Sequence, residues 1–293
     1  MNPFVEAARP RTLPAAVAPV LVGSAAAQRA VADLDWLRFG LALVVALALQ
    51  VAVNYANDLF DGVKGIDTTD RTGPRRAVAT GLVTPTGMRN ATVAALLVAV
   101  VAGSVLAALV GWELLLVGAF AILATLLYSG GGRPYASLGL GEVSVFVFFG
   151  LVATVGSQYV QDEQVGLLAV AASVPVGLIA VALLVVNNLR DIPQDLVAAK
   201  RTLAVRLGAA RTRMFFQGLV GGALAWLLPV AALAESPWPL LGLAALPVAL
   251  VAMRTVARAP LGRELIPALE LTGRLHLLVG VLLAVGLAFA TGI

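Results

Sequence analysis

The sequence predicts an all-α membrane protein that crosses the bilayer several times. Of its 293 residues, 60% are hydrophobic and 12% are charged, and the mean hydropathy is +0.95. Because soluble domains carry about 25% charged residues, this composition excludes a soluble enzyme and a disordered chain. The chain has no cysteine and a single histidine, His276, which excludes disulfides, a cysteine nucleophile and a multi-histidine metal centre.

Nine apolar runs approach the length of about 20 residues that a membrane-spanning helix needs. The runs are apolar on all sides instead of alternating, which favours helices over the strands of a barrel. The first, fourth and eighth runs are short. We therefore expect one membrane-embedded domain over residues 1–293, with nine transmembrane helices. Their predicted ranges are 13–27, 37–55, 91–110, 114–127, 138–155, 165–186, 214–234, 238–253 and 275–293.

The positive charges lie almost entirely on one side of these predicted helices. Eighteen of the 20 Lys and Arg residues fall in the N-terminal segment and in the loops after the second, fourth, sixth and eighth runs. The other side carries Arg29 and Arg38. Because cytoplasmic loops are enriched in Lys and Arg, we expect a cytoplasmic N-terminus and an outer C-terminus. The preference for Arg over Lys is typical of a GC-rich bacterial genome, so the expected location is a bacterial cell membrane.

Two clusters of Asn and Asp follow the second and sixth runs, on the side expected to be cytoplasmic. A charge at the end of an apolar helix is costly to bury and usually marks function. Helical spacings of three, four and seven residues would align each cluster along one face. The first cluster contains Asn54, Asn57, Asp58 and Asp61, with Asp67 beyond it, and the second contains Asn188, Asp191 and Asp195.

Oxygen ligands without His or Cys suit Mg²⁺, which takes one or two carboxylates and completes its shell with water and phosphate. Two such clusters on one side predict a pair of Mg²⁺ sites bridged by a diphosphate. The alternative is that these carboxylates cap helices or pair with loop arginines. Nearby cations could clamp phosphate oxygens. They are Lys64 and Arg75 after the first cluster, Lys200 and Arg201 after the second, and Arg133 in the glycine-rich stretch that follows Tyr128.

These motifs resemble the UbiA superfamily of membrane-intrinsic prenyltransferases. The resemblance rests on Asn57-Asp58-x-x-Asp61, on the loop over residues 128–135, and on Asp191-x-x-x-Asp195. Three stretches, residues 8–14, 57–67 and 200–208, are most similar to the branch that prenylates 1,4-dihydroxy-2-naphthoate in menaquinone synthesis. The commonest superfamily motif, NDxxDxxxD, would place its last Asp at Gly65, whereas the next acid here is Asp67.

The resemblance implies nine helices around a central cavity and a Mg²⁺-dependent transfer from polyprenyl diphosphate to the naphthoate ring. Loss of CO₂ would then give demethylmenaquinone. A lipid bilayer is expected around the chain, and no nucleic-acid partner. The implied catalytic residues are Asp58, Asp61, Asp191 and Asp195. The implied metal ligands are these four with Asn57 and Asp67. The implied substrate-binding residues are Asn54, Lys64, Arg75, Tyr128, Arg133, Asn188, Lys200, Arg201 and Arg11.

Arg11 is the expected partner of the acceptor's carboxylate, because it is distant in sequence from both aspartate clusters. Its alternative role is that of an ordinary positive anchor at the membrane surface. Two other functions remain open at this point. A prenyltransferase of the same fold could act on another aromatic acceptor, such as 4-hydroxybenzoate. A transporter would place ionisable residues near the bilayer midplane, whereas here they lie at helix ends.

Overall fold

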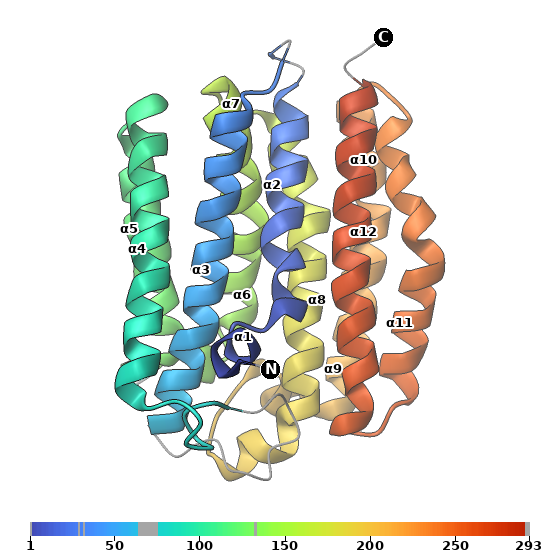
Figure 1. Ribbon diagram of the computed structural model, residues 1–293. Coiled ribbons are helices and arrows are strands. Elements are labelled where there is room, and N and C mark those ends of the chain that lie inside the picture. The colour runs from blue at the N-terminus through green and yellow to red at the C-terminus, as the bar shows by residue number, and fades with distance from the viewer. Residues whose placement is uncertain (1, 29, 32, 64–75, 132–133, 291–293) are drawn as a thin grey trace.

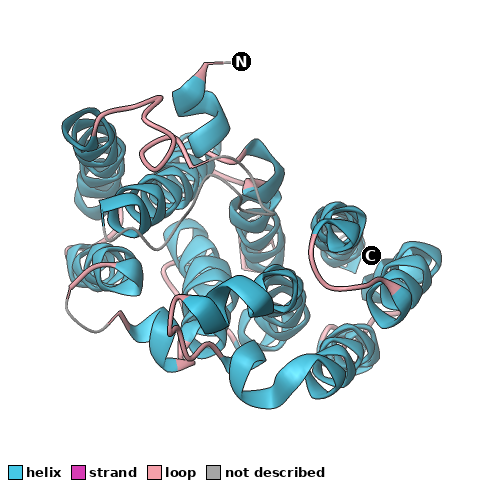
Figure 2. Cartoon of the chain, turned by 90° about the horizontal axis from the view of Figure 1, so that it is seen from below, coloured by secondary structure: helices cyan, strands magenta, loops and turns pink. Residues whose placement is uncertain are grey.

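The computed structural model describes residues 2–28, 30–31, 33–63, 76–131 and 134–290. Within these residues all regular structure is helical (Figure 1). The long helices run side by side along one direction, and they appear nearly end-on when the bundle is turned (Figure 2). The predicted all-α fold is therefore confirmed.

The helices follow one another through short connections. The first part of the chain forms α1 (Pro3–Ala7), η1 (Pro10–Thr12), α2 (Pro14–Ala27), α3 (Trp36–Val63), α4 (Pro85–Leu109) and α5 (Glu113–Ser129). The middle part forms η2 (Tyr135–Leu138), α6 (Gly141–Val145), η3 (Phe146–Val152), α7 (Ala153–Asp162) and α8 (Leu167–Val197). The last part forms α9 (Leu203–Ala225), α10 (Leu227–Leu233), η4 (Trp238–Ala245), α11 (Leu246–Arg258), η5 (Arg263–Leu265) and α12 (Ile266–Ala290).

Seven helical segments of the described chain are long and apolar enough to cross a membrane. Two further apolar helices, α2 and α5, lie at predicted positions but have only 14 and 17 residues. The nine predicted runs therefore correspond to nine helical segments, of which seven have the length of a full span. In Figure 1, α1 lies at the lower end of the bundle and α12 ends at the upper end, as an odd number of crossings requires. The protein is a multi-pass membrane protein.

Several helices are longer than the apolar runs that predicted them. The second and sixth runs end at residues 55 and 186, but α3 and α8 continue to Val63 and Val197. The last helix begins at Ile266 instead of residue 275. An apolar run marks the part of a helix that meets lipid, whereas the helix itself continues as long as its backbone hydrogen bonds can form. Both aspartate clusters therefore lie on helices, and His276 lies well inside α12.

Helix α8 forms the centre of the bundle. In its most apolar stretch 72% of the residues are buried, the largest share among the seven candidate spans. It packs against α9, α12, α2 and η3. Helices α4 and α5 instead expose large apolar side chains such as Val101 and Phe120. Lipid is as apolar as these side chains, so such a surface is stable in a bilayer.

The π-helical segment η3 approaches α8 closely through two glycines. A Cβ atom on Gly150 would lie 2.7 Å from the Cα atom of Gly177, so neither position has room for a larger side chain. Small residues allow two backbones to come together in this way in membranes. Two aromatic residues of η3, Phe148 and Phe149, line the cavity described below.

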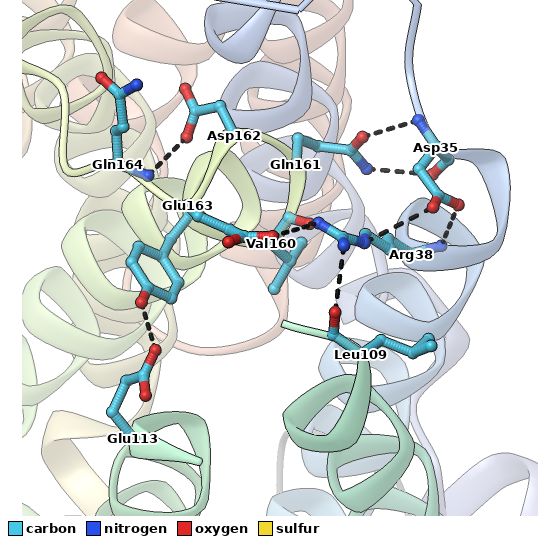
Figure 3. A network of polar contacts seen from close by, with 10 residues as sticks. Asp35, Arg38, Leu109, Glu113, Val160, Gln161, Asp162, Glu163 and Gln164 are labelled. Atoms are coloured by element: carbon cyan, nitrogen blue, oxygen red, sulfur yellow. Dashed lines mark hydrogen bonds and ion pairs between the residues drawn. The ribbon is translucent and has the colours of Figure 1, made fainter. Parts of the chain in front are cut away.

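A polar network closes the upper end of the bundle, opposite the aspartate clusters (Figure 3). Arg38, near the start of α3, donates hydrogen bonds to the carbonyl oxygens of Leu109 and Val160, both at 3.1 Å. These carbonyls belong to the last turns of α4 and α7, where helix carbonyls lack a partner within the helix. Arg38 also pairs with Glu163 at 3.1 Å. One side chain therefore joins three helices.

We expect Arg38→Met to lower the midpoint of thermal unfolding in detergent by a few degrees. The substitution leaves two helix-end carbonyls without their charged donor, a loss of about 1.5–3 kcal/mol. Arg254→Met, at an exposed position of α11, is the matched control and should leave the midpoint unchanged. Equal midpoints for the two variants would show that the Arg38 contacts do not stabilise the bundle.

Candidate active site

The first acidic cluster lies on the last turns of α3. Because the helix continues to Val63, Asn54, Asn57 and Asp61 occupy neighbouring turns of one helical face. The Asp61 side chain is buried although it lies near the end of the helix. The helix therefore holds a carboxylate inside the lower end of the bundle.

The second cluster lies on the last turns of α8. This helix continues through Pro193 and carries Asp191 and Asp195, both buried. The Asn188 side chain donates a hydrogen bond to Glu142 of α6 at 3.0 Å. The contact orients the Asn188 amide beside the cluster.

A single cavity of about 550 Å³ connects the two clusters. Asn57 and Asp61 line it from α3, and Asp191 and Asp195 line it from α8. The expectation that the clusters converge is therefore met by these four residues. Beyond the acidic end the walls are mainly apolar, and they include Val100, Leu115, Ile122, Phe148, Phe149 and Val152.

Two cations contact Asp61 from segments far apart in the sequence. Arg76 Nη2 and Lys200 Nζ lie 3.3 and 3.2 Å from its Oδ2 atom. Lys200 follows α8, so its bond to α3 joins the two clusters directly. A buried carboxylate is stable only when it is paired, and these contacts provide the pairing.

The acids of α8 are also paired. Arg190 donates to both carboxylate oxygens of Asp191, at 2.6 and 2.7 Å. Thr202 Oγ1 donates to Asp195 at 3.3 Å. Each predicted acid in the cavity therefore has a positive or hydrogen-bonding partner supplied by the chain.

Asp58 has different surroundings from the other three predicted catalytic acids. Its two carboxylate oxygens accept the backbone N–H groups of Ala77 and Val78, at 3.0 and 2.9 Å, and its side chain is not part of the cavity wall. The reason is that the chain returns from the loop after α3 and lies against this turn of the helix. The structure thus gives Asp58 the task of anchoring residues 77–78, in place of the cavity position that the motif predicted.

The other predicted substrate-binding residues divide into three groups. Asn54, Tyr128, Asn188 and Lys200 line the cavity. Arg11 and Arg201 do not, and this corrects the prediction for both. Arg11 is 72% exposed and pairs with Glu270 of α12 at 2.6 Å, and Arg201 is exposed beyond α8. Lys64, Asp67, Arg75 and Arg133 lie outside the described residues.

Some polar residues of the cavity were not predicted. Gln50 donates to Thr12 Oγ1 at 3.0 Å, and Asn54 donates to the same oxygen at 3.1 Å. Both amides lie on an otherwise apolar stretch of α3, four residues apart. A polar residue inside an apolar helix is a signal that could have identified Gln50. The proximity of Arg9 and Thr202 to the cavity depends on loops and had no such signal.

An aromatic pair forms another part of the wall. The rings of Tyr128 and Tyr135 meet edge to face, with centroids 5.5 Å apart. The Tyr135 hydroxyl donates to the carbonyl of Ala124 at 2.8 Å. Burial raises the pKa of Tyr135, so its hydroxyl stays protonated at neutral pH and its ring stays uncharged. This wall suits a flat aromatic ligand.

The chemistry of these side chains fits Mg²⁺ better than a softer metal. The cavity acids and amides offer only oxygen ligands, and in the described part of the chain no three His, Cys, Asp or Glu residues form a single cage. Mg²⁺ commonly binds one or two carboxylates and takes its remaining ligands from phosphate and water. Two separated carboxylate groups facing one cavity agree with that pattern.

Comparison with known proteins supports the same interpretation. The chain matches the UbiA prenyltransferase family over residues 16–264. It is 48% identical to 1,4-dihydroxy-2-naphthoate octaprenyltransferase of Mycobacterium tuberculosis, covering 98% of this chain and 97% of that protein. It is 36% identical to the Escherichia coli enzyme of the same name, covering 97% and 94%.

Solved structures share the fold at low sequence identity. A UbiA homolog from Archaeoglobus fulgidus bound to GPP and Mg²⁺ superimposes with a TM-score of 0.70 at 15% identity, covering 99% of this chain and 100% of that one. A homolog from Aeropyrum pernix K1 gives 0.71 at 15% identity, covering 92% and 96%. The motifs, the fold and the sequence similarity agree, and the chain belongs to the UbiA prenyltransferase family.

Proposed function

We propose that this membrane prenyltransferase transfers a polyprenyl group from polyprenyl diphosphate to 1,4-dihydroxy-2-naphthoate, with loss of CO₂. The product is demethylmenaquinone, an intermediate of menaquinone synthesis. One observation carries the proposal: a single cavity joins paired acids and cations at one end to a long apolar section. A prenyl diphosphate has the same division into a charged head and an apolar tail. The naphthoate acceptor is supported by the names of the similar enzymes.

Asp61 of α3 and Asp191 and Asp195 of α8 are the proposed ligands of Mg²⁺, with Asn57 beside them. When bound, Mg²⁺ would neutralise the diphosphate and stabilise it as a leaving group. Lys200 and Arg76 already lie beside Asp61, so they can bind the diphosphate oxygens as that carboxylate turns to the metal. Asp58 supports this arrangement indirectly by anchoring the backbone next to Arg76.

The apolar section of the cavity would hold the prenyl chain and exclude water. Its walls come from α4, α5, η3 and α7. Breaking the C–O bond gives diphosphate and an allylic cation, which water would destroy. The electron-rich ring then forms the new C–C bond, and departure of the carboxylate as CO₂ returns an electron pair to the ring. No protein nucleophile is needed, which agrees with a chain that has no Cys.

The membrane orientation is part of the proposal. Eighteen of the 20 Lys and Arg residues belong to the predicted cytoplasmic side, which is the side of the aspartate clusters. The water-soluble diphosphate would therefore leave into the cytoplasm of a bacterial cell, and the C-terminus would lie outside. The prenylated product would remain in the bilayer.

An assay of the purified protein with a panel of acceptors tests the function. With Mg²⁺ and a polyprenyl diphosphate, we expect 1,4-dihydroxy-2-naphthoate to give prenylated product, diphosphate and CO₂ in equal amounts. Chelation of Mg²⁺ should abolish all three. Prenylation of 4-hydroxybenzoate in place of the naphthoate would contradict the acceptor. Absence of Mg²⁺-dependent diphosphate release with every acceptor would contradict the whole reaction.

The two roles proposed for Lys200 predict opposite effects of Lys200→Met. Without the ammonium group next to Asp61, Mg²⁺ alone should bind more tightly, seen as a larger rise in the thermal unfolding midpoint with added Mg²⁺. The KM of the prenyl donor should instead rise, because a charged hydrogen bond is worth about 1.5–3 kcal/mol, or roughly 10- to 150-fold.

Arg201→Met is the matched control, because it removes a neighbouring exposed cation that does not line the cavity. It should change neither the response to Mg²⁺ nor the KM of the donor. If Lys200→Met behaves like this control, Lys200 does not contact the diphosphate.

A further inference from the structure

Three cations of the described residues line the cavity: Arg9, Arg76 and Lys200. Two of them, Arg76 and Lys200, bind Asp61 and are assigned above to the diphosphate. Arg9 enters the cavity from the segment between α1 and η1, so it belongs to a separate part of the wall. An acceptor with a carboxylate needs a cation that the diphosphate does not occupy.

Local chain geometry separates Arg9 from Arg11. Arg9 precedes Pro10, whose ring disfavours the right-handed helical conformation at the residue before it. Arg9 adopts the left-handed conformation, with φ of 52° and ψ of 68°, and η1 begins directly after it. As a result Arg9 lines the cavity, whereas Arg11 points to Glu270 on α12.

The unusual backbone at Arg9 is held in place by α3. A left-handed conformation costs about 1–2 kcal/mol for a residue other than glycine. The Arg9 carbonyl accepts hydrogen bonds from the backbone N–H of Thr12, at 2.8 Å, and from its hydroxyl, at 2.9 Å. The Thr12 hydroxyl in turn accepts from Gln50 and Asn54, and Asn54 also donates to the carbonyl of Ala8 at 2.9 Å.

This anchoring has a consequence for the side chain. Strain that the surroundings maintain is typical of sites where a side chain must be aimed. Gln50, Asn54 and Thr12 all line the same cavity as Arg9. The network therefore fixes the backbone from which the guanidinium enters the cavity.

The aromatic wall lies near this guanidinium. Arg9 interacts electrostatically with the hydroxyl of Tyr128, and the Tyr128 ring packs against Tyr135. A cation beside an uncharged aromatic surface is complementary to a flat ring that carries a carboxylate. That is the chemistry of the proposed acceptor.

We propose that Arg9 binds the carboxylate of the aromatic acceptor, and that this contact makes the enzyme select a carboxylated ring. The inference rests on the proposed function, since it concerns the acceptor of that reaction. Arg9 holds the carboxylate while the prenyl donor binds to Asp61 and the α8 cluster. Arg11 has no part in this contact.

The test compares two ligands with the same ring, 1,4-dihydroxy-2-naphthoate and 1,4-dihydroxynaphthalene, which lacks the carboxylate. Their dissociation constants are measured without donor for the wild-type protein, Arg9→Gln, Arg9→Lys and the matched control Arg11→Gln. The wild-type protein and Arg11→Gln should bind the naphthoate roughly 10- to 150-fold more tightly. Arg9→Gln should bind both ligands equally, and Arg9→Lys should recover part of the preference.

The KM of the prenyl donor provides the second readout. It should be unchanged in Arg9→Gln, which also shows that the variant is folded. Arg9 would be excluded as the carboxylate partner if Arg9→Gln keeps the wild-type preference, if it raises only the KM of the donor, or if Arg11→Gln is the variant that loses the preference. If the wild-type protein itself prenylates only a different acceptor, the proposed function fails together with this inference.

Discussion

A carboxylate buried in an apolar bundle must be paired, and the lower end of this bundle is organised around the pairing of Asp61. Arg76 comes to it from the chain that returns after α3, and Lys200 comes from the chain that leaves α8. Three segments distant in sequence are thereby held at one point. The same pairing keeps negative charge facing the cavity, where a divalent metal and a diphosphate could replace the protein's own cations.

Apolar packing and polar chemistry are divided between the two ends of the same helices. The middle of α8 is the most buried apolar stretch among the candidate spans, while its last turns carry the second acidic cluster. A rigid, tightly packed helix places catalytic groups more precisely than a loop does. The long apolar wall next to them can shield an allylic cation from water, and the Arg38 network holds three helices together at the far end.

Much of this arrangement could be predicted from the sequence, because helical spacing alone determines it. Asp61 and Asp191 were identified from charge at the ends of apolar runs, and both line the cavity. The predictions for Asp58 and Arg11 differ from the structure for another reason. Asp58 is oriented by the returning backbone of residues 77–78, and Arg11 is turned away by the conformation that Pro10 imposes on Arg9. Contacts of this kind depend on the path of loops, which hydrophobic periodicity does not encode.

The central claim is that the acids of α3 and α8 serve one donor diphosphate, and binding of Mn²⁺ in place of Mg²⁺ tests it most directly. Binding is followed by electron paramagnetic resonance, with and without an unreactive prenyl thiodiphosphate, for the wild-type protein, Asp61→Asn, Asp191→Asn and Asp33→Asn, an exposed acid between α2 and α3. The account predicts that the analogue tightens Mn²⁺ binding. Either cavity substitution should weaken this analogue-dependent binding at least about tenfold, or roughly 1.4 kcal/mol, and Asp33→Asn should not change it. Unchanged analogue-dependent binding in Asp191→Asn would contradict the account, because the two clusters would then not share a site.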